Sequence, residues 1–330
     1  MADFFASARA KFDGLRARLN LPYPGKFDDM HLGAQSIFAS RFLFDGLKVD
    51  LGTGHSANFH TGHGMRLGSA NMPQSYSYTA LFATDHQMMQ GTVETDGSLM
   101  GRMLFHLAPA LTSTVDLRYV PGNMAAMQPP HESLQAEMDY KGADFAANFK
   151  LANPWPLDFT GVAVASYLQS VTSRLALGIE TAVHNPAPGH ADASLTLAAK
   201  YTLPVWHLDS VPAAPGEPVP QQPTAAPVAT ASIASHGLLH LAYVQPVSTK
   251  ATVATELNIG MSPRGGPEGV ATVAAKYDFR DSTFRTQIDS QGKIASVLEQ
   301  RFGVMAFTMA GEVDHWKGQS RFGFGLQLEV

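Results

Sequence analysis

The sequence predicts an all-β fold, a transmembrane β-barrel of about nineteen strands with an N-terminal helical segment inside or across its lumen. Three observations support this prediction. Hydrophobic and polar residues alternate with a period of two from about residue 35 onward. The alternating runs are about ten residues long, which is the length of a tilted membrane-spanning strand. No window of about 18 residues is apolar enough to form a membrane-spanning helix.

The stretch 131–151 shows the alternation clearly. Leu134, Met138 and Tyr140 fall on one face of the expected strand, and Glu137 falls on the other. The pattern resumes after Gly142, which predicts a hairpin with a tight turn. Further turn signals separate the other runs at residues 96–97, 123, 185–186, 265–266, 291–292 and 317–318.

Two architectures accept many alternating strands. A soluble sandwich or propeller buries its apolar face in a core, whereas a membrane barrel turns that face toward lipid and its polar face toward a wet lumen. Strands of sandwiches average about 5–6 residues. The longer runs of this chain therefore favour the membrane barrel.

The chain divides into an N-terminal amphipathic segment, residues 1–34, and a barrel, residues 35–330. Hydrophobic residues at helical spacing form one stripe within residues 1–19: Phe4, Phe5, Ala8, Phe12, Leu15 and Leu19. A cleavable targeting peptide is the alternative interpretation, which Asp3 and Asp13 weaken. Residues 204–227 contain seven prolines. No central strand tolerates so many, so we expect a mobile loop inserted between two strands.

Composition excludes several classes of protein. The 330 residues include 23 Lys and Arg against 28 Asp and Glu, a net charge of −5, which argues against a nucleic-acid partner. The absence of cysteine excludes disulfides, thiolate metal sites and cysteine nucleophiles. His55, His60 and His63 resemble a metal site only superficially, because residues 60 and 63 of one strand point to opposite faces. We expect neither a metal nor a cofactor.

Carboxylates are spread over the polar faces of the expected strands and interleave with Arg and Lys. Such a distribution is typical of the lining of a wide aqueous channel, in which charge sets ion preference, rather than of a catalytic pair. We therefore predict a channel and not an enzyme. The lining candidates are Glu94, Asp116, Glu137, Asp139, Glu180, Glu256, Asp289, Glu299, Glu312 and Asp314.

Several stretches resemble the pore-forming subunit of the mitochondrial outer-membrane protein translocase, the TOM complex. They are residues 159–172 (FTGVAVASYLQSVT), 175–180 (LALGIE), 275–280 (AKYDFR), 289–295 (DSQGKIA) and 312–317 (EVDHWK). The similarity covers about residues 24–203 and 231–330. The proline-rich segment and the exact N-terminus have no counterpart in the family.

The C-terminal strand is similar to the sorting β-signal of mitochondrial barrels, which reads polar, any, Gly, hydrophobic, any, hydrophobic, any, hydrophobic. The matching residues are Arg321, Gly323, Phe324, Leu326 and Leu328. This motif is less specific than residues 159–180, because voltage-dependent anion channels also carry it.

The resemblance implies a nineteen-stranded barrel of the mitochondrial outer membrane, with parallel first and last strands and an N-terminal segment in the lumen. It implies a pore that passes unfolded precursors from the cytosol to the intermembrane space. The net acidic charge of the chain favours cations in that pore. On this basis the ten lining carboxylates are candidates for contact with basic presequences. The implied partners are such precursors, a central single-span receptor subunit, small helical subunits, a second copy of the barrel and membrane lipid.

Two rival functions remain open. An anion-channel-type metabolite porin shares the fold, the compartment and the β-signal, but we expect its lumen to be net basic. A soluble all-β enzyme or binding protein would need a constellation of catalytic groups. No such constellation stands out in this sequence.

Overall fold

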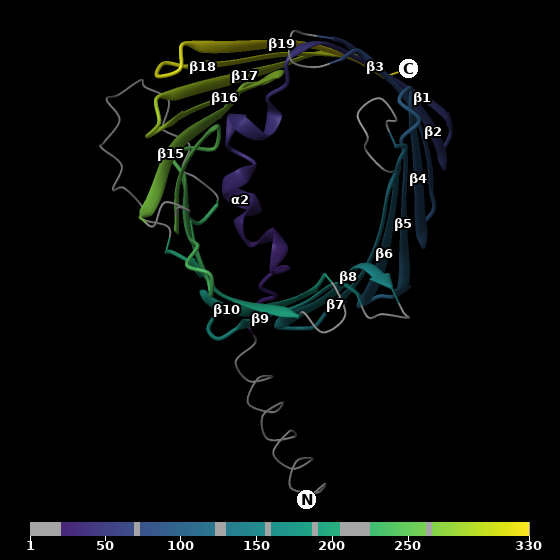
Figure 1. The fold of residues 1–330 in the computed structure, drawn as a ribbon. Helices are drawn as coiled ribbons and strands as arrows, with labels where there is room; N and C mark the ends of the chain where they lie inside the picture. The colour runs from purple at the N-terminus through teal and green to yellow at the C-terminus, as the bar shows by residue number, and fades with distance from the viewer. Residues whose placement is uncertain are drawn as a thin grey trace, which may run out of the picture.

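The computed structural model describes residues 21–68, 73–122, 130–155, 160–186, 191–204, 225–261 and 266–329, and these form a closed barrel (Figure 1). The predicted number of nineteen strands is confirmed. The strands are β1 (Gly46–Ser56), β2 (Phe59–Leu67), β3 (Ser75–Ala83), β4 (Gln87–Glu94), β5 (Leu99–Ala108), β6 (Leu111–Val120), β7 (His131–Lys141), β8 (Phe145–Trp155), β9 (Thr160–Ser170), β10 (Leu175–Asn185), β11 (Asp192–Thr202), β12 (Val228–Ala234), β13 (Leu239–Pro246), β14 (Ala251–Met261), β15 (Pro267–Asp278), β16 (Ser282–Asp289), β17 (Lys293–Phe302), β18 (Met305–Asp314) and β19 (Gln319–Glu329).

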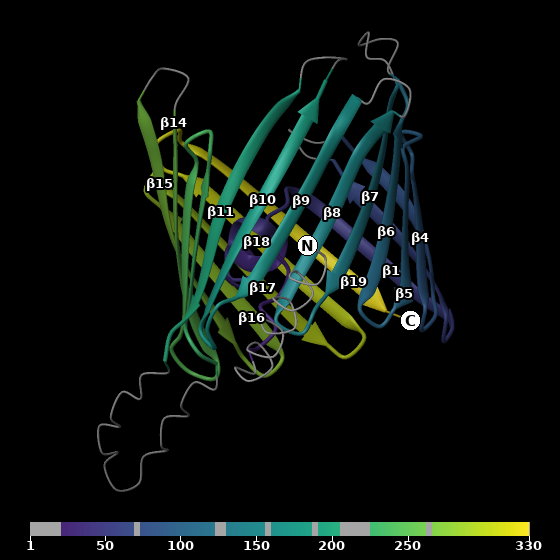
Figure 2. The ribbon, with the colours of Figure 1, turned by 90° about the horizontal axis from the view of Figure 1, so that it is seen from below.

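Each strand pairs antiparallel with the next, and the barrel closes where β1 meets β19 in parallel. An odd number of strands joined by hairpins leaves the first and last strands running the same way, so the closing pair must be parallel. The register of this seam runs from Gly46 opposite Gly323 to Gly52 opposite Glu329. The strands are tilted relative to the barrel axis (Figure 2), as closure of a barrel requires.

The alternation of each strand separates a lumen face from a membrane face. In β14, Ala254 lies under the N-terminal segment inside the lumen, and its neighbour Thr255 points outward. Cross-strand pairing carries this assignment around the barrel. By this register the Asp, Glu, Lys and Arg side chains of the described strands fall on the lumen face, with Glu132 at one end of β7 as the exception. Large hydrophobic side chains such as Phe324 and Leu197, each 50% exposed, cover the outside.

The chain enters the lumen before the first strand. Residues 21–45 form the inner segment, which contains η1 (Asp28–His31), α2 (Leu32–Gln35) and η2 (Ala39–Phe42). The inner segment crosses the interior of the barrel (Figure 1). Helical turns continue past residue 35 to Phe42, and the first strand begins at Gly46. The predicted stripe within residues 1–19 lies outside the described residues.

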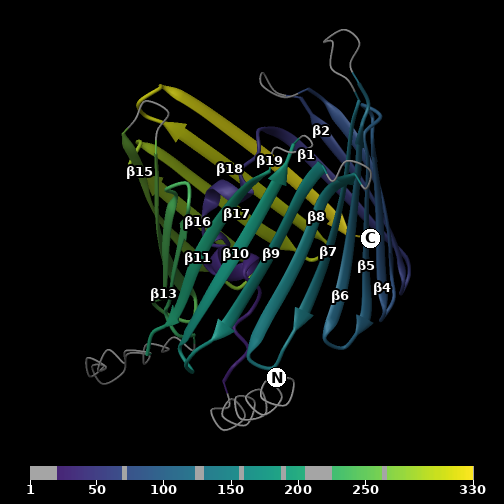
Figure 3. The same ribbon diagram turned by 60° about the horizontal axis from the view of Figure 1, so that its bottom comes forward.

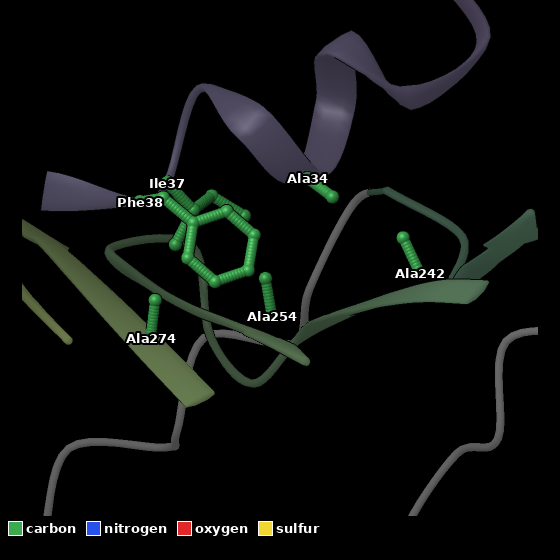
Figure 4. Packing of buried hydrophobic residues seen from close by; sticks show 6 residues of the cluster. All are labelled: Ala34, Ile37, Phe38, Ala242, Ala254 and Ala274. Atoms are coloured by element: carbon green, nitrogen blue, oxygen red, sulfur yellow. The ribbon is translucent and has the colours of Figure 1, made fainter. Parts of the chain in front are cut away.

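Three apolar clusters hold the inner segment on the wall. Phe27 and Met30 pack on Leu168, Ala176 and Ala198 of β9–β11. The second cluster joins the middle of the segment to β13–β15 (Figure 4), and its members are Ala34, Ile37, Phe38, Ala242, Ala254 and Ala274. The third joins the end of the segment to β17 and β18, through Ala39, Ala295, Val297 and Ala310. Alanines on the wall leave room for the bulky side chains of the segment.

The inner segment enters at the rim where β9 turns into β10 (Figure 3). The hydroxyl of Ser170 donates a hydrogen bond to the Pro22 carbonyl over 2.7 Å, and the Lys200 ammonium donates one to the Pro24 carbonyl over 2.9 Å. The end of β11 lies at this same rim, since the Thr202 amide donates to the Arg174 carbonyl. The predicted loop 204–227 therefore begins at this rim, and its residues 205–224 lie outside the described residues.

No helix in the described ranges is long and apolar enough to cross a membrane.

Removing the Phe38 ring should loosen the inner segment. Phe38 is 4% exposed, and Phe-to-Ala changes in cores cost about 3–5 kcal/mol. The chain has no cysteine, and Gly33 faces open space, so Gly33→Cys can carry a nitroxide label. We expect Phe38→Ala to increase the mobility of this label in electron paramagnetic resonance spectra. Leu32→Ala, at a side chain that is 39% exposed, is the control and should leave the spectrum unchanged.

Candidate pore lining and inner segment

All ten carboxylates singled out in the sequence lie on the lumen face. Glu94 and Asp116 are on β4 and β6, and the other eight follow on β7, β10, β14, β16, β17 and β18. Cross-strand pairing places them there, because the register carries the lumen face from one strand to the next, starting from Ala254 beneath the inner segment. Whether any of them contacts cargo stays a prediction.

Two hollows in the lumen wall show how the inner segment divides the lining. One, of about 440 Å³, is lined by Gln90, Arg102, Asp116 and other residues of β4–β7. The second, of about 460 Å³, lies between the segment, at Gln35 and Arg41, and the wall at β14–β16. The clusters, hydrogen bonds and ion pairs of the segment within the described residues reach β7–β18. The wall of β2–β6 thus faces the interior across from the segment (Figure 1).

Most of the ten carboxylates are already paired. Asp116 accepts two hydrogen bonds from the Arg102 guanidinium, at 2.7 and 3.0 Å. The remaining pairs are Asp139–Lys26 at 2.7 Å, Glu312–Arg321 at 2.8 Å, Glu299–Arg285 at 3.0 Å, Glu256–His240 at 3.0 Å and Glu137–Lys150 at 3.8 Å. Pairing removes much of the attraction that each carboxylate could offer to a basic ligand.

Asp289 and Asp314 have a structural task at strand ends. The Asp314 carboxylate accepts hydrogen bonds from the backbone amides of Trp316 and Lys317, at 3.0 and 2.9 Å. Asp289 accepts from the amides of Gln291 and Lys293, both at 2.9 Å. Both side chains therefore shape the turns that follow β18 and β16, a role that Asp commonly has.

Glu94 and Glu180 differ from the rest. Within the described part of the chain, neither carboxylate lies within ion-pair distance of a Lys or Arg side chain. Glu94 is on the wall that faces the inner segment across the lumen, whereas Glu180 lies on β10 among residues near the segment. Asp29 of the inner segment is exposed, and Glu94 and Glu180 are partly exposed. These three acids remain open to a cationic ligand.

Charged contacts fix the first half of the inner segment. Lys26 binds Asp139, which also accepts a 2.6 Å hydrogen bond from the amide of Asn148. Burial tends to lower the pKa of Lys26, but the hydrogen bond and charge of Asp139 outweigh it and raise the pKa above its ordinary value. Two residues further on, Asp28 pairs with Lys150 of β8.

His31 marks the middle of this interface. Its ring lies 4.0 Å from the His240 ring, centroid to centroid, and its Nδ1 lies 2.8 Å from the Thr230 hydroxyl. Burial, and then the neighbouring His240, lower the pKa of His31 to about 4, against a weaker opposite effect of Glu256. His31 is therefore neutral in its docked position near pH 7, where it can share a hydrogen bond with Thr230.

No group of His, Asp or Glu within the described residues has the geometry of a metal site. His60 is on the lumen face of β2, and His63 on the membrane face, where its Nδ1 lies 2.7 Å from the Tyr76 hydroxyl.

Comparisons with known proteins identify the family. Residues 23–325 match the family described as "Eukaryotic porin". The chain belongs to the eukaryotic porin family, among its TOM40 members. It is 31% identical to "Mitochondrial import receptor subunit TOM40" of Saccharomyces cerevisiae over 354 residues, covering 100% of this chain and 84% of that protein. It is 29% identical to the Neurospora crassa protein of that name, over 97% of this chain and 86% of the relative. The human homologue is 25% identical, over 93% of this chain and 79% of the relative.

This membership establishes a β-barrel of the mitochondrial outer membrane, as the resemblance implied. The parallel seam and the segment inside the lumen agree with the same resemblance. The five residues of the predicted β-signal all lie in β19. Arg321 and Gly323 are on its lumen face, and Phe324, Leu326 and Leu328 face the membrane. Their role in sorting stays a prediction.

Sequence reasoning missed the residues that fasten the inner segment. Lys26, Asp28 and His31 contact the wall at residues far away in the sequence, such as Thr230. No periodicity indicates which strand such a segment will meet.

Docking of the inner segment should weaken in acid. Between pH 6.5 and pH 4 a released His31 binds a proton, whereas the docked His31 does not. Acidification through this range therefore favours release of the segment. Above pH 7 His31 is neutral in both states, so docking should not change. The titratable groups that face His31 are His240 and Glu256. We expect the label at Gly33→Cys to become more mobile as the pH falls through this window. His31→Gln should remove most of the change; a pH profile identical to that of the parent would contradict the assignment.

Proposed function

We propose that this protein is the protein-conducting channel of a mitochondrial import complex, and that it passes unfolded precursors from the cytosol to the intermembrane space. The observation that carries the proposal is the similarity to TOM40 import subunits over nearly the whole chain. The charged side chains on the lumen face of the strands agree with it. A wide, polar lumen lets an extended chain keep its backbone hydrated during passage. The proposal needs no covalent chemistry and no cofactor.

Weak and distributed attraction would move such cargo. Presequences are basic, and an exposed ion pair contributes about 0–1 kcal/mol. Contacts of this strength at Glu94, Glu180 and Asp29 would hold a basic segment briefly and release it. Binding that is favourable enough for entry but weak enough for exit is the general requirement for conduction. The same unpaired acids would give the pore a preference for cations.

The relatives are named as import receptor subunits, so we propose that this chain also works within the TOM complex. The partners that we propose are precursors with presequences, a central single-span receptor subunit, small helical subunits, a second copy of the barrel and membrane lipid. The similarity to import subunits over nearly the whole chain weighs against a metabolite porin.

Photo-crosslinking tests the proposed path directly. Gln90 and Gly91 are neighbours on β4, and Gln90 faces the lumen whereas Gly91 faces the membrane. We expect a photoreactive amino acid in place of Gln90 to crosslink to a translocation-arrested precursor in mitochondria. The same probe in place of Gly91 should not. A correctly inserted barrel that yields no adduct from Gln90 or from Glu137 would contradict the proposal.

Ion selectivity provides a second test. We expect Glu94→Gln combined with Glu180→Gln to lower the ratio of cation to anion permeability by roughly twofold, because these unpaired acids act on ions at the strength of weak exposed pairs. Reversal potentials in planar bilayers under a salt gradient measure the ratio. Glu132→Gln removes a charge that is not on the lumen face and is the matched control. An equal effect of the control would count against the assignment.

A further inference from the structure

The end of the inner segment lies against two glycines of the last strand. A Cβ atom added to Gly323 would collide with the carbonyl oxygen of Phe44 and would lie 2.7 and 2.8 Å from two carbons of its ring. A Cβ atom added to Gly325 would lie 3.1 Å from the tip of the Phe44 ring and 3.3 Å from Thr308 Cβ. Only a strand without side chains at both positions can accept Phe44 in this place.

These glycines sit at the start of the parallel seam. Gly46, with a φ of 80°, turns the chain into β1 and pairs with Gly323, and Lys48 pairs with Gly325. Phe42, Leu43 and Phe44 also pack on the third apolar cluster, which belongs to β17 and β18. The Arg285 guanidinium stacks 4.1 Å from the centre of the Phe42 ring. The end of the inner segment is thus fastened to β16, β17 and β18, the strands that lead into β19.

Alternation alone does not set the register of this seam. A slip by one residue would turn Lys48 and Asp50 toward the membrane, and is therefore excluded. A slip by two residues keeps every side chain on its proper face. It would, however, replace one of the two glycines beside Phe44 with Arg321 or Gln327. Both of these residues carry long side chains. Only the observed register places glycines at both positions.

We propose that Gly323 and Gly325 form a docking slot for Phe44 that selects the register of β1 on β19 and so closes the barrel. The slot is a property of the folded chain itself. The two glycines are therefore required even where no cellular factor reads the C-terminal strand. This requirement is separate from the sorting role that the β-signal implies for Gly323.

Cysteine pairs across the seam can report its register, because the chain has no cysteine of its own. Val49 pairs with Leu326 on the membrane face, so Val49→Cys with Leu326→Cys reports the native register. Val49→Cys with Phe324→Cys, or with Leu328→Cys, reports a slip by two in either direction. The full chain is purified, refolded in detergent without sorting factors, and oxidised. Disulfide yield is then measured for each pair.

We expect Gly325→Ala to lower the yield of the native reporter severalfold. Adding Phe44→Ala should restore much of it, because the ring tip is the closest group to that Cβ. Gly323→Ala should be more damaging and should not be rescued, since its Cβ collides with the main-chain oxygen of residue 44. Phe44→Ala alone should raise the yield of a slipped reporter, which tests the slot even where a glycine variant fails to refold.

Gly62→Ala is the matched control. Gly62 is on the lumen face of β2, and its added Cβ would meet only ordinary contacts at 3.8 and 3.9 Å. This variant should refold with the native yield. Three results would each overturn the proposal. The first is a native disulfide yield that Gly325→Ala leaves unchanged, and the second is a loss of that yield in Gly325→Ala that Phe44→Ala does not relieve. The third is a slipped-register disulfide yield that Phe44→Ala leaves unchanged. The outcome does not depend on whether the pore conducts proteins.

Discussion

Apolar packing inside a wet lumen is the interaction on which the rest of this structure depends. Ile37 and Phe38 lie on a row of alanines, Ala242, Ala254 and Ala274, that continues across three neighbouring strands. Larger residues there would hold the segment away from the wall. Docking at this row joins one side of the lumen to the inner segment, directs Phe44 to the seam, and leaves β2–β6 facing the interior.

The charges of the lumen are better balanced than a count of carboxylates indicates. Some acids, such as Asp139, are used to hold the inner segment, and others, such as Glu312, pair with a base on the next strand. Asp289 and Asp314 shape turns. The attraction left for a basic ligand comes from a few unpaired acids. A channel that must release its cargo needs weak attraction of this kind.

The sequence was sufficient for properties that repeat locally. A period of two gives the strands, their number and the face of each carboxylate, because every strand obeys the same alternation. It does not indicate long-range partners. Lys26 pairs with Asp139, which is 113 residues away in the sequence. This pairing depends on where the inner segment crosses the barrel. The helical turns that continue to Phe42 have the same kind of cause, since they pack on the wall at β17 and β18.

We expect the inner segment to be a fixed part of the lumen wall that does not move aside as a plug. Pulsed electron–electron distance measurement between nitroxides at Gly33→Cys and Gly91→Cys tests it most directly, because neither position has another residue within 4 Å of an added Cβ. A fixed segment should give one narrow distance distribution in lipid membranes, and the distribution should not change when a precursor is arrested in the pore. A broad distribution, or one that shifts when the precursor is present, would contradict it.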